Sequence, residues 1–310
     1  MMLKKYLGGA LSSRLVNCKN IGYESYEAKP LKSDEQIRKY YEKKWNDYFQ
    51  HKDERESEFV LDKGDWISNS NGVFGLGKGF TSNGSIKCSD SGNKFIINLN
   101  QNSIGHSRSD VLYSNQIINV LSGSKCEIKN GILKAQNVYS KGSVLYVGMN
   151  GFLECELCYF ENSHTNRSGG AIYGSKSSNI KLNNCKFDKN SANGFGGAVF
   201  IEPKSNFECN NCEFIDNRSK FARGGAIYLK EDSKNLCLKN CTFQNNKSRC
   251  CDETIFVGNK NKLICVNCGF QSDSYDNLVY ANDSANIELL NCSINDSIPL
   301  NEHIRGYLKS

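Results

Sequence analysis

Cysteine is the residue type in this chain that most directly suggests chemistry. The sequence of 310 residues contains 15 cysteines, and some of them stand in pairs with the spacing CxxC. Two thiolates at this spacing are a common half of a tetrahedral zinc site, and cysteines also form disulfides or act as nucleophiles. The three pairs are Cys155/Cys158, Cys209/Cys212 and Cys265/Cys268. Their role depends on the elements that position them.

The cysteines belong to an internal repeat with a period of about 27 residues. Similar phrases, such as CKFDKN and CEFIDN, begin at an anchor cysteine, and successive anchors lie 27, 27, 29, 27 and 24 residues apart. The anchors are Cys158, Cys185, Cys212, Cys241, Cys268 and Cys292. Asparagine precedes most anchors, at Asn184, Asn211, Asn240, Asn267 and Asn291, and Asn130 precedes Gly131, the equivalent position one period before Cys158. Leu157 takes its place in one repeat.

The apolar residues around each anchor predict short strands. Residues two positions apart share one face of a strand, as do Ile180 with Leu182 and Cys185 with Phe187. The asparagine between the two pairs tolerates a left-handed backbone, so it predicts a tight bend joining two strands. A further apolar triplet, such as AVF at 198–200, predicts a third strand.

Three strands per repeat, each aligned with the strand one period away, predict an all-β fold, a right-handed parallel β-helix or solenoid. We expect regular coils at 126–297, irregular first coils at 57–125 and a cap or tail at 298–310. Residues 1–56 form an N-terminal segment. Within it, 33–50 has the capping box and apolar spacing of an amphipathic helix, which we expect to cap or lie along the N-terminal end of the solenoid.

The repeat changes the interpretation of the cysteines. The first cysteine of each CxxC pair shares its column with Leu182, Leu238 and Leu289, so a plain hydrophobe serves equally well there. Free cysteine packs as a small apolar side chain. We therefore predict buried thiols in a structural ladder with the bend asparagines and no metal or cofactor, with zinc and disulfides as the open alternatives.

Two columns alternate along the third strand. One is aliphatic, with Leu145, Ile172, Val199, Ile227, Ile255 and Val279. The other is aromatic, with Tyr146, Tyr173, Phe200, Tyr228, Phe256 and Tyr280. The aliphatic column is favoured for the core, which makes the aromatic column a candidate exposed stripe for binding. The opposite register remains an alternative.

Two elements of the repeat carry a resemblance to a known family. GGA[IV] occurs at Gly169–Ile172, Gly196–Val199 and Gly224–Ile227, and FxxN occurs at Phe187–Asn190, Phe214–Asn217 and Phe243–Asn246. The region 126–297 thus resembles the repeats of polymorphic outer membrane proteins. The resemblance implies a right-handed β-helix and, in bacterial members, a surface-displayed passenger linked to adhesion.

Other features limit the function classes. The net charge of +6 comes from scattered Lys and Arg residues, which does not favour a nucleic-acid partner. No apolar run is long enough to span a membrane, and the N-terminus is a weak signal peptide. His, Ser and Arg meet in IGHSR at 104–108, for which a loop is the ordinary explanation. Carboxylates such as Asp188 and Asp216 stand where turns are expected.

These observations predict a non-enzymatic, adhesin-like β-helix that binds an unknown protein or glycan along its length, with no catalytic residue assigned. A carbohydrate-active enzyme, either a polysaccharide lyase or a hydrolase, is one alternative, and an intracellular structural scaffold is another. The sequence favours a cytoplasmic location, whereas the family resemblance favours the cell surface.

Overall fold

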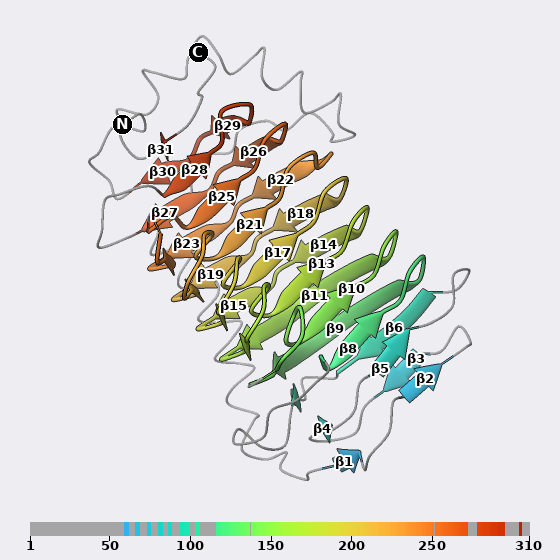
Figure 1. Cartoon of the computed structure of the whole chain (residues 1–310). Coiled ribbons are helices and arrows are strands. Elements are labelled where there is room, and N and C mark those ends of the chain that lie inside the picture. The colour runs from blue at the N-terminus through green and yellow to red at the C-terminus, as the bar shows by residue number, and fades with distance from the viewer. Residues whose placement is uncertain are drawn as a thin grey trace.

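The computed structural model describes short strands between residues 59 and 105 and the ranges 116–136, 138–250, 252–271, 278–294 and 304–305. All regular secondary structure within them is β, and the strands stack in parallel into a solenoid (Figure 1). The prediction of an all-β parallel solenoid is therefore confirmed. The helix predicted at 33–50 lies outside the described residues.

Sheet A receives two strand segments from each regular coil. The first series is β3 (Val73–Gly75), β6 (Lys94–Asn98), β9 (Lys125–Lys134), β11 (Phe152–Glu161), β14 (Asn179–Asn183), β18 (Asn206–Asn210), β22 (Leu236–Lys239), β26 (Lys262–Val266) and β29 (Asn286–Leu290). The second series is β1 (Phe59–Leu61), β4 (Phe80–Ser82), β7 (Ser103–Gly105), the ends of β9 and β11, β15 (Lys186–Asp188), β19 (Glu213–Ile215), β23 (Thr242–Gln244), β27 (Gly269–Gln271) and β30 (Ser293–Ile294).

Sheet B adds a further strand to the coils, and sheet C adds a short strand to four of the described coils. Sheet B consists of β2 (Trp66–Ser68), β5 (Ile86–Cys88), β8 (Ile118–Val120), β10 (Leu145–Val147), β13 (Ile172–Gly174), β17 (Val199–Ile201), β21 (Ile227–Leu229), β25 (Ile255–Val257), β28 (Val279–Ala281) and β31 (Ile304–Arg305). Sheet C consists of β12 (His164–Thr165), β16 (Ser191–Ala192), β20 (Arg218–Ser219) and β24 (Lys247–Ser248). β31 comes from the segment predicted as a cap or tail and pairs with β28.

Successive coils pair in a register of one sequence period, which stacks like residues on like. Leu153 pairs with Ile180, and Ile180 pairs with Phe207, so their side chains form one continuous inner column. All three are buried in the hydrophobic core. Strands of neighbouring coils lie about 4.8 Å apart, so each inner side chain is covered above and below by its equivalents.

The bend between the two segments of sheet A has a left-handed backbone in every repeat where the sequence places the bend column. Asn184 has φ 52°, Asn211 has φ 51° and Asn240 has φ 50°. Leu157, at φ 52°, adopts the same conformation despite its Cβ and branched side chain. Asparagine adopts a left-handed conformation more readily than leucine does. The conformation of the bend therefore explains the preference for asparagine, and it strains the backbone at Leu157.

We expect the substitution Leu157→Asn to raise the free energy of unfolding by about 1 kcal/mol, because it relieves the left-handed strain. The reverse change, Asn184→Leu, places the same strain in the next coil and should lower it by a similar amount. Urea unfolding of both variants and the parent chain measures the two effects. Shifts of the same sign in the two variants would contradict this explanation of the bend.

Candidate functional site

The structure places the anchor cysteines one above another inside the solenoid. The six anchors are buried, and so are the first cysteines of the CxxC pairs. Cys155 pairs with Leu182, and Leu182 with Cys209, so cysteine and leucine alternate in one inner column as the sequence indicated. The cysteines described by the structure carry free thiols, and all but Cys250 are buried.

Each anchor thiol donates a hydrogen bond to the equivalent backbone carbonyl of the preceding coil. The sequence did not indicate these hydrogen bonds. Cys185 donates to the carbonyl oxygen of Cys155 at 3.5 Å, and Cys212 donates to that of Leu182 at 3.4 Å. Cys268 continues the pattern with Leu238 at 3.5 Å. Cysteine is small, apolar and a weak donor, so it fills the core and also contacts a carbonyl close to the bend of the preceding coil.

Burial also affects the ionisation of four of the anchor thiols. It raises the pKa of Cys158, Cys212, Cys241 and Cys292 well above the usual value, so the thiolate form is disfavoured. Among the residues that the structure describes, no three His, Cys, Asp or Glu side chains converge in a way that could hold a metal ion. The six anchors lie in the hydrophobic core of the described coils.

A second ladder involves the asparagines of the FxxN elements, which the sequence suggested only as turn residues. Asn190, Asn217 and Asn246 are almost fully buried. The Nδ2 of Asn190 donates to Oδ1 of Asn217 at 3.0 Å, and Nδ2 of Asn217 donates to Oδ1 of Asn246 at 2.8 Å. Each Nδ2 also donates to a backbone carbonyl, as Asn217 does to Phe187 at 3.0 Å. The recurrence of Asn three residues after Phe was the feature of the sequence that could have indicated this ladder.

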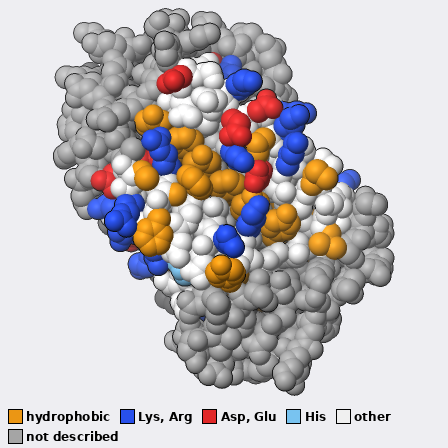
Figure 2. Space-filling view, viewed as in Figure 1, with side chains coloured by type: hydrophobic (Ala, Val, Ile, Leu, Met, Phe, Trp, Pro, Cys, Tyr) orange, Lys and Arg blue, Asp and Glu red, His pale blue; other side chains and the backbone are white. Residues whose placement is uncertain are grey.

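The six aromatic side chains of sheet B form what we call the outer aromatic band, defined by Tyr146, Tyr173, Phe200, Tyr228, Phe256 and Tyr280. The alternating aliphatic residues belong to the hydrophobic core, so the rings point outward. Figure 2 shows apolar side chains in a diagonal band across this face, with charged side chains on both sides. The band continues over six coils because its members pair in register.

The exposure expected of this column is absent at three of its six members. Tyr173, Phe200 and Phe256 are only 2%, 5% and 4% exposed, whereas Tyr146, Tyr228 and Tyr280 are half-buried. Stacking between coils covers the faces of all six rings, since the ring centroids of adjacent members lie 4.5 to 5.7 Å apart. Binding by this column remains a prediction.

Neighbouring side chains cover further parts of the band. Phe195, from the loop before β17, lies 4.7 Å from the Tyr228 ring between centroids. The guanidinium of Arg223 lies 4.5 Å from the Tyr280 centroid and 5.2 Å from that of Phe256. These contacts restrain the Phe195 ring and the Arg223 guanidinium against the band.

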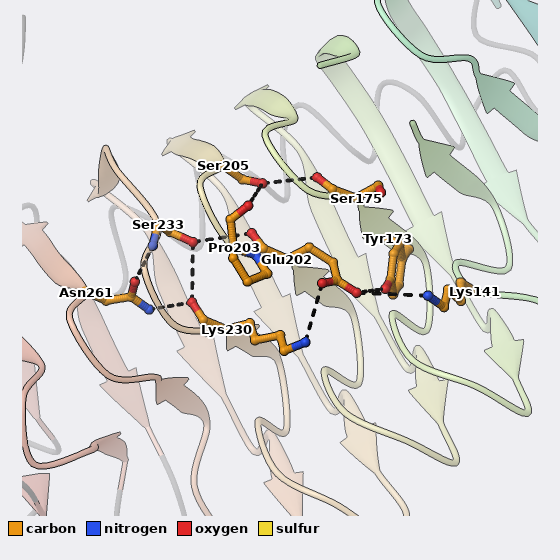
Figure 3. Close-up of polar contacts among 9 residues, drawn as sticks. All are labelled: Lys141, Tyr173, Ser175, Glu202, Pro203, Ser205, Lys230, Ser233 and Asn261. Carbon is orange, nitrogen blue, oxygen red and sulfur yellow. Dashed lines mark hydrogen bonds and ion pairs between the residues drawn. The ribbon is translucent and has the colours of Figure 1, made fainter. Parts of the chain in front are cut away.

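Glu202 is the centre of a polar cluster beside the band, drawn in Figure 3. Its carboxylate accepts a hydrogen bond from the Tyr173 hydroxyl and lies 3.5 Å from Nζ of Lys230 and 3.9 Å from Nζ of Lys141. Burial, together with the hydrogen bond to Glu202, raises the pKa of Tyr173 far above its usual range. The tyrosine therefore stays neutral, and its hydroxyl links the outer aromatic band to the Glu202 carboxylate.

The turn next to this cluster is held by small polar residues. Ser205 donates to the carbonyl of Ser175 at 3.1 Å, and Nδ2 of Asn261 donates to that of Lys230 at 2.7 Å (Figure 3). The Ser233 amide donates to Oδ1 of Asn261 at 2.7 Å. The backbone that carries Glu202 and Lys230 is thus fixed from coil to coil.

The other candidates of the sequence do not come together into one site. Of IGHSR, the structure describes Ile104 and Gly105 in β7, and the remaining three residues lie outside the described part. Asp188 accepts a hydrogen bond from the Tyr159 hydroxyl at 2.8 Å, while Asp216 is exposed in a left-handed turn. Asp216 therefore has the turn environment that the sequence suggested, whereas Asp188 is the last residue of strand β15.

The pKa of His164, in β12 of sheet C, responds to the charge of a nearby lysine. Burial lowers its pKa below the usual 6.5, and the positive charge of Lys220 lowers it further. We expect the imidazole to titrate below 6.5 in an NMR pH titration and Lys220→Gln to move the pKa upward. Lys204→Gln, on a different turn, is the matched control and should leave it unchanged. Equal shifts in both variants would contradict a local effect of Lys220.

Comparison with known proteins bears on the repeat. Residues 184–202 match the family model described as the Chlamydia polymorphic membrane protein (Chlamydia_PMP) repeat. The matched segment contains one FxxN and one GGA[IV] element, and with the parallel solenoid it confirms the resemblance to a polymorphic membrane protein-like repeat family. No curated protein and no solved structure matches the chain. The described residues include no helix long and apolar enough to cross a membrane.

Proposed function

We propose that this chain is a non-enzymatic, adhesin-like binding protein that presents the outer face of sheet B to a protein or glycan partner. The observation that carries the proposal is the outer aromatic band, which contains three half-buried tyrosines among closed rings and ends beside Arg223. Aromatic residues and arginine are the types most enriched in binding hot spots. Stacking restrains the rings before any partner arrives, which reduces the entropic cost of binding.

The solenoid and its repeat support the same proposal at a coarser level. Each coil adds an equivalent strip of surface, so a partner can contact several coils at once. The match at residues 184–202 associates the repeat with membrane proteins, which supports display at the cell surface. A scaffold inside the cell would use the same architecture, and localisation distinguishes the two.

The arrangement around Glu202 suits binding better than catalysis. Glycoside hydrolases act through a pair of carboxyl groups flanking the sugar bond. The Glu202 carboxylate is instead engaged by Lys141, Lys230 and the Tyr173 hydroxyl. Such a carboxylate fixes neighbouring side chains, and a lyase or hydrolase would have to break these contacts to use it.

A glycan array probed with the full chain, combined with surface labelling of cells that express it, tests the proposal. We expect binding to at least one array component and labelling of the intact cell surface. The double variant Tyr146→Ser with Tyr228→Ser removes two half-buried rings of the band and should abolish the binding. Met149→Ser changes a side chain that is 49% exposed outside the band and serves as the control. Protein found only in the cytosolic fraction would overturn the adhesin-like function.

A further inference from the structure

Cations that are scattered in the sequence come together on sheet C. Arg218 at the start of β20 pairs in register with Lys247 at the start of β24. The amide of Arg249 donates to the carbonyl of Ser219, and that of Lys220 donates to Ala192, so Lys220 and Arg249 follow the paired strands at equivalent positions. We call Arg218, Lys220, Lys247 and Arg249 the basic edge. Figure 2 shows Lys and Arg side chains gathered at the left edge of the view.

The charges of the basic edge are not balanced within the described part of the chain. None of its four side chains forms an ion pair with a carboxylate there. Arg218, Lys247 and Arg249 are exposed. Of the nearby acids, Glu253 is buried and bonded to Ser248 at 2.8 Å. Asp216 and Asp252 occupy left-handed turn positions on the same two coils.

Unbalanced like charges in register are unfavourable for the chain alone. Like charges directly opposite on neighbouring strands lower stability, and Arg218 and Lys247 form such a pair. A bound polyanion would convert this repulsion into attraction. The four cations stand two on each of two adjacent coils, a compact patch that suits a ligand with closely spaced anionic groups.

The aromatic residues beside the basic edge distinguish between classes of polyanion. Phe221 is 62% exposed, and the guanidinium of Arg249 lies 5.7 Å from its ring centroid. On an earlier coil, Arg167 lies 5.0 Å from the Tyr139 centroid in the same manner. Single-stranded nucleic acids are bound by open ring faces on which bases stack. Here the rings orient guanidinium groups, which bind oxyanions through paired hydrogen bonds.

We propose that the basic edge binds a linear sulfated polysaccharide, with Arg218, Lys220, Lys247 and Arg249 contacting its sulfate groups. The site lies on a different sheet from the outer aromatic band and does not depend on it. Binding is electrostatic and therefore weakens steeply as the salt concentration rises.

Heparin affinity measured on the full chain as a function of salt tests this site. The triple variant Arg218→Gln, Lys247→Gln and Arg249→Gln should bind heparin about tenfold or more weakly, with a flatter salt dependence. The control triple Lys176→Gln, Lys204→Gln and Lys234→Gln removes the same charge from exposed lysines elsewhere and should bind as the parent does. Equal losses of heparin affinity in both triple variants would mean that net charge alone governs binding, and they would overturn the proposal.

Two further measurements separate the alternatives. Desulfated heparin should fail to compete, whereas tighter binding of oligo(dT) than of heparin would assign the edge to nucleic acid and refute our proposal. The basic-edge triple should also unfold at the same or a higher urea concentration, because it removes the Arg218/Lys247 repulsion. Lower stability of this triple variant would contradict the inference that Arg218 and Lys247 repel each other. Retained heparin binding in the Tyr146→Ser with Tyr228→Ser variant would show that the two surfaces are independent.

Discussion

Replacing Gly197 with alanine is expected to lower the free energy of unfolding by about 3 kcal/mol or more. A Cβ at this position would lie 2.0 Å from the carbonyl oxygen of Gly225 and 2.6 Å from backbone atoms of Arg218. Both contacts are with backbone, which cannot move aside as a flexible side chain can. The two coils would have to separate, and the hydrogen bond from the Gly197 amide to the Gly224 carbonyl at 2.9 Å would be lost or weakened.

The two glycines of the GGA[IV] element serve different purposes. Gly196 has φ +67°, a left-handed conformation that side chains disfavour. Gly197 is needed because the backbone of the next coil occupies the space where a side chain would be. The same division holds at Gly169 and Gly170, where a Cβ on the second glycine would lie 1.8 Å from the carbonyl oxygen of Gly197.

Gly269→Ala provides the matched control for this prediction. A Cβ there would meet the Ser293 hydroxyl oxygen at 3.4 Å and a Thr242 methyl at 3.9 Å, which are ordinary contact distances. Because glycine weakens a strand, alanine at this position in β27 should be neutral or slightly stabilising. Urea unfolding of both variants gives the comparison. Equal stability of the Gly197→Ala and Gly269→Ala variants would mean that the coils do not approach closely at the double glycine.

The fold was predictable from the sequence because the solenoid repeats the same environment. A column such as Leu153, Ile180 and Phe207 is one inner position sampled once per coil, so a pattern of period 27 reports burial directly. The left-handed bend was visible for a similar reason, since asparagine recurs where φ is positive. Even the exception at Leu157 follows the conformation of its column.

The surfaces were not predictable to the same degree. The Tyr/Phe column indicated outward rings, but the closure of Tyr173 by stacking and by the hydrogen bond to Glu202 depends on contacts between coils. Lys220 and Arg249 are 29 residues apart and become neighbours only through strand pairing. Charge, unlike burial, is not required to repeat in every coil, so no column of the repeat pointed to the basic edge.

The FxxN ladder carries the second large effect, and the change that reveals it is Asn217→Asp. The side chain of Asn217 is fully buried, with Oδ1 accepting from the amide and from Nδ2 of Asn190, both at 3.0 Å. Its Nδ2 faces two acceptors, the Phe187 carbonyl and Oδ1 of Asn246. Aspartate has the same shape but presents an oxygen to both acceptors.

We expect Asn217→Asp to lower the free energy of unfolding at pH 7 by about 4 kcal/mol, through two lost donors and one buried charge. Protonation restores one donor and removes the charge, so the pKa of the new carboxyl should be raised in the folded state. Its destabilisation is therefore smallest below the unfolded pKa of about 3.9 and grows as the pH rises toward the folded pKa.

Urea unfolding of the Asn217→Asp variant between pH 4 and pH 8 measures this dependence against the parent chain. Asn259→Asp makes the same chemical change at an exposed turn position and should have little effect at any pH in that range. A destabilisation by Asn217→Asp that does not grow with pH would show that packing alone, and not the donor pattern, accounts for the loss. A stable variant at pH 7 would mean that the ladder accepts a carboxylate, which the two acceptors facing Nδ2 forbid.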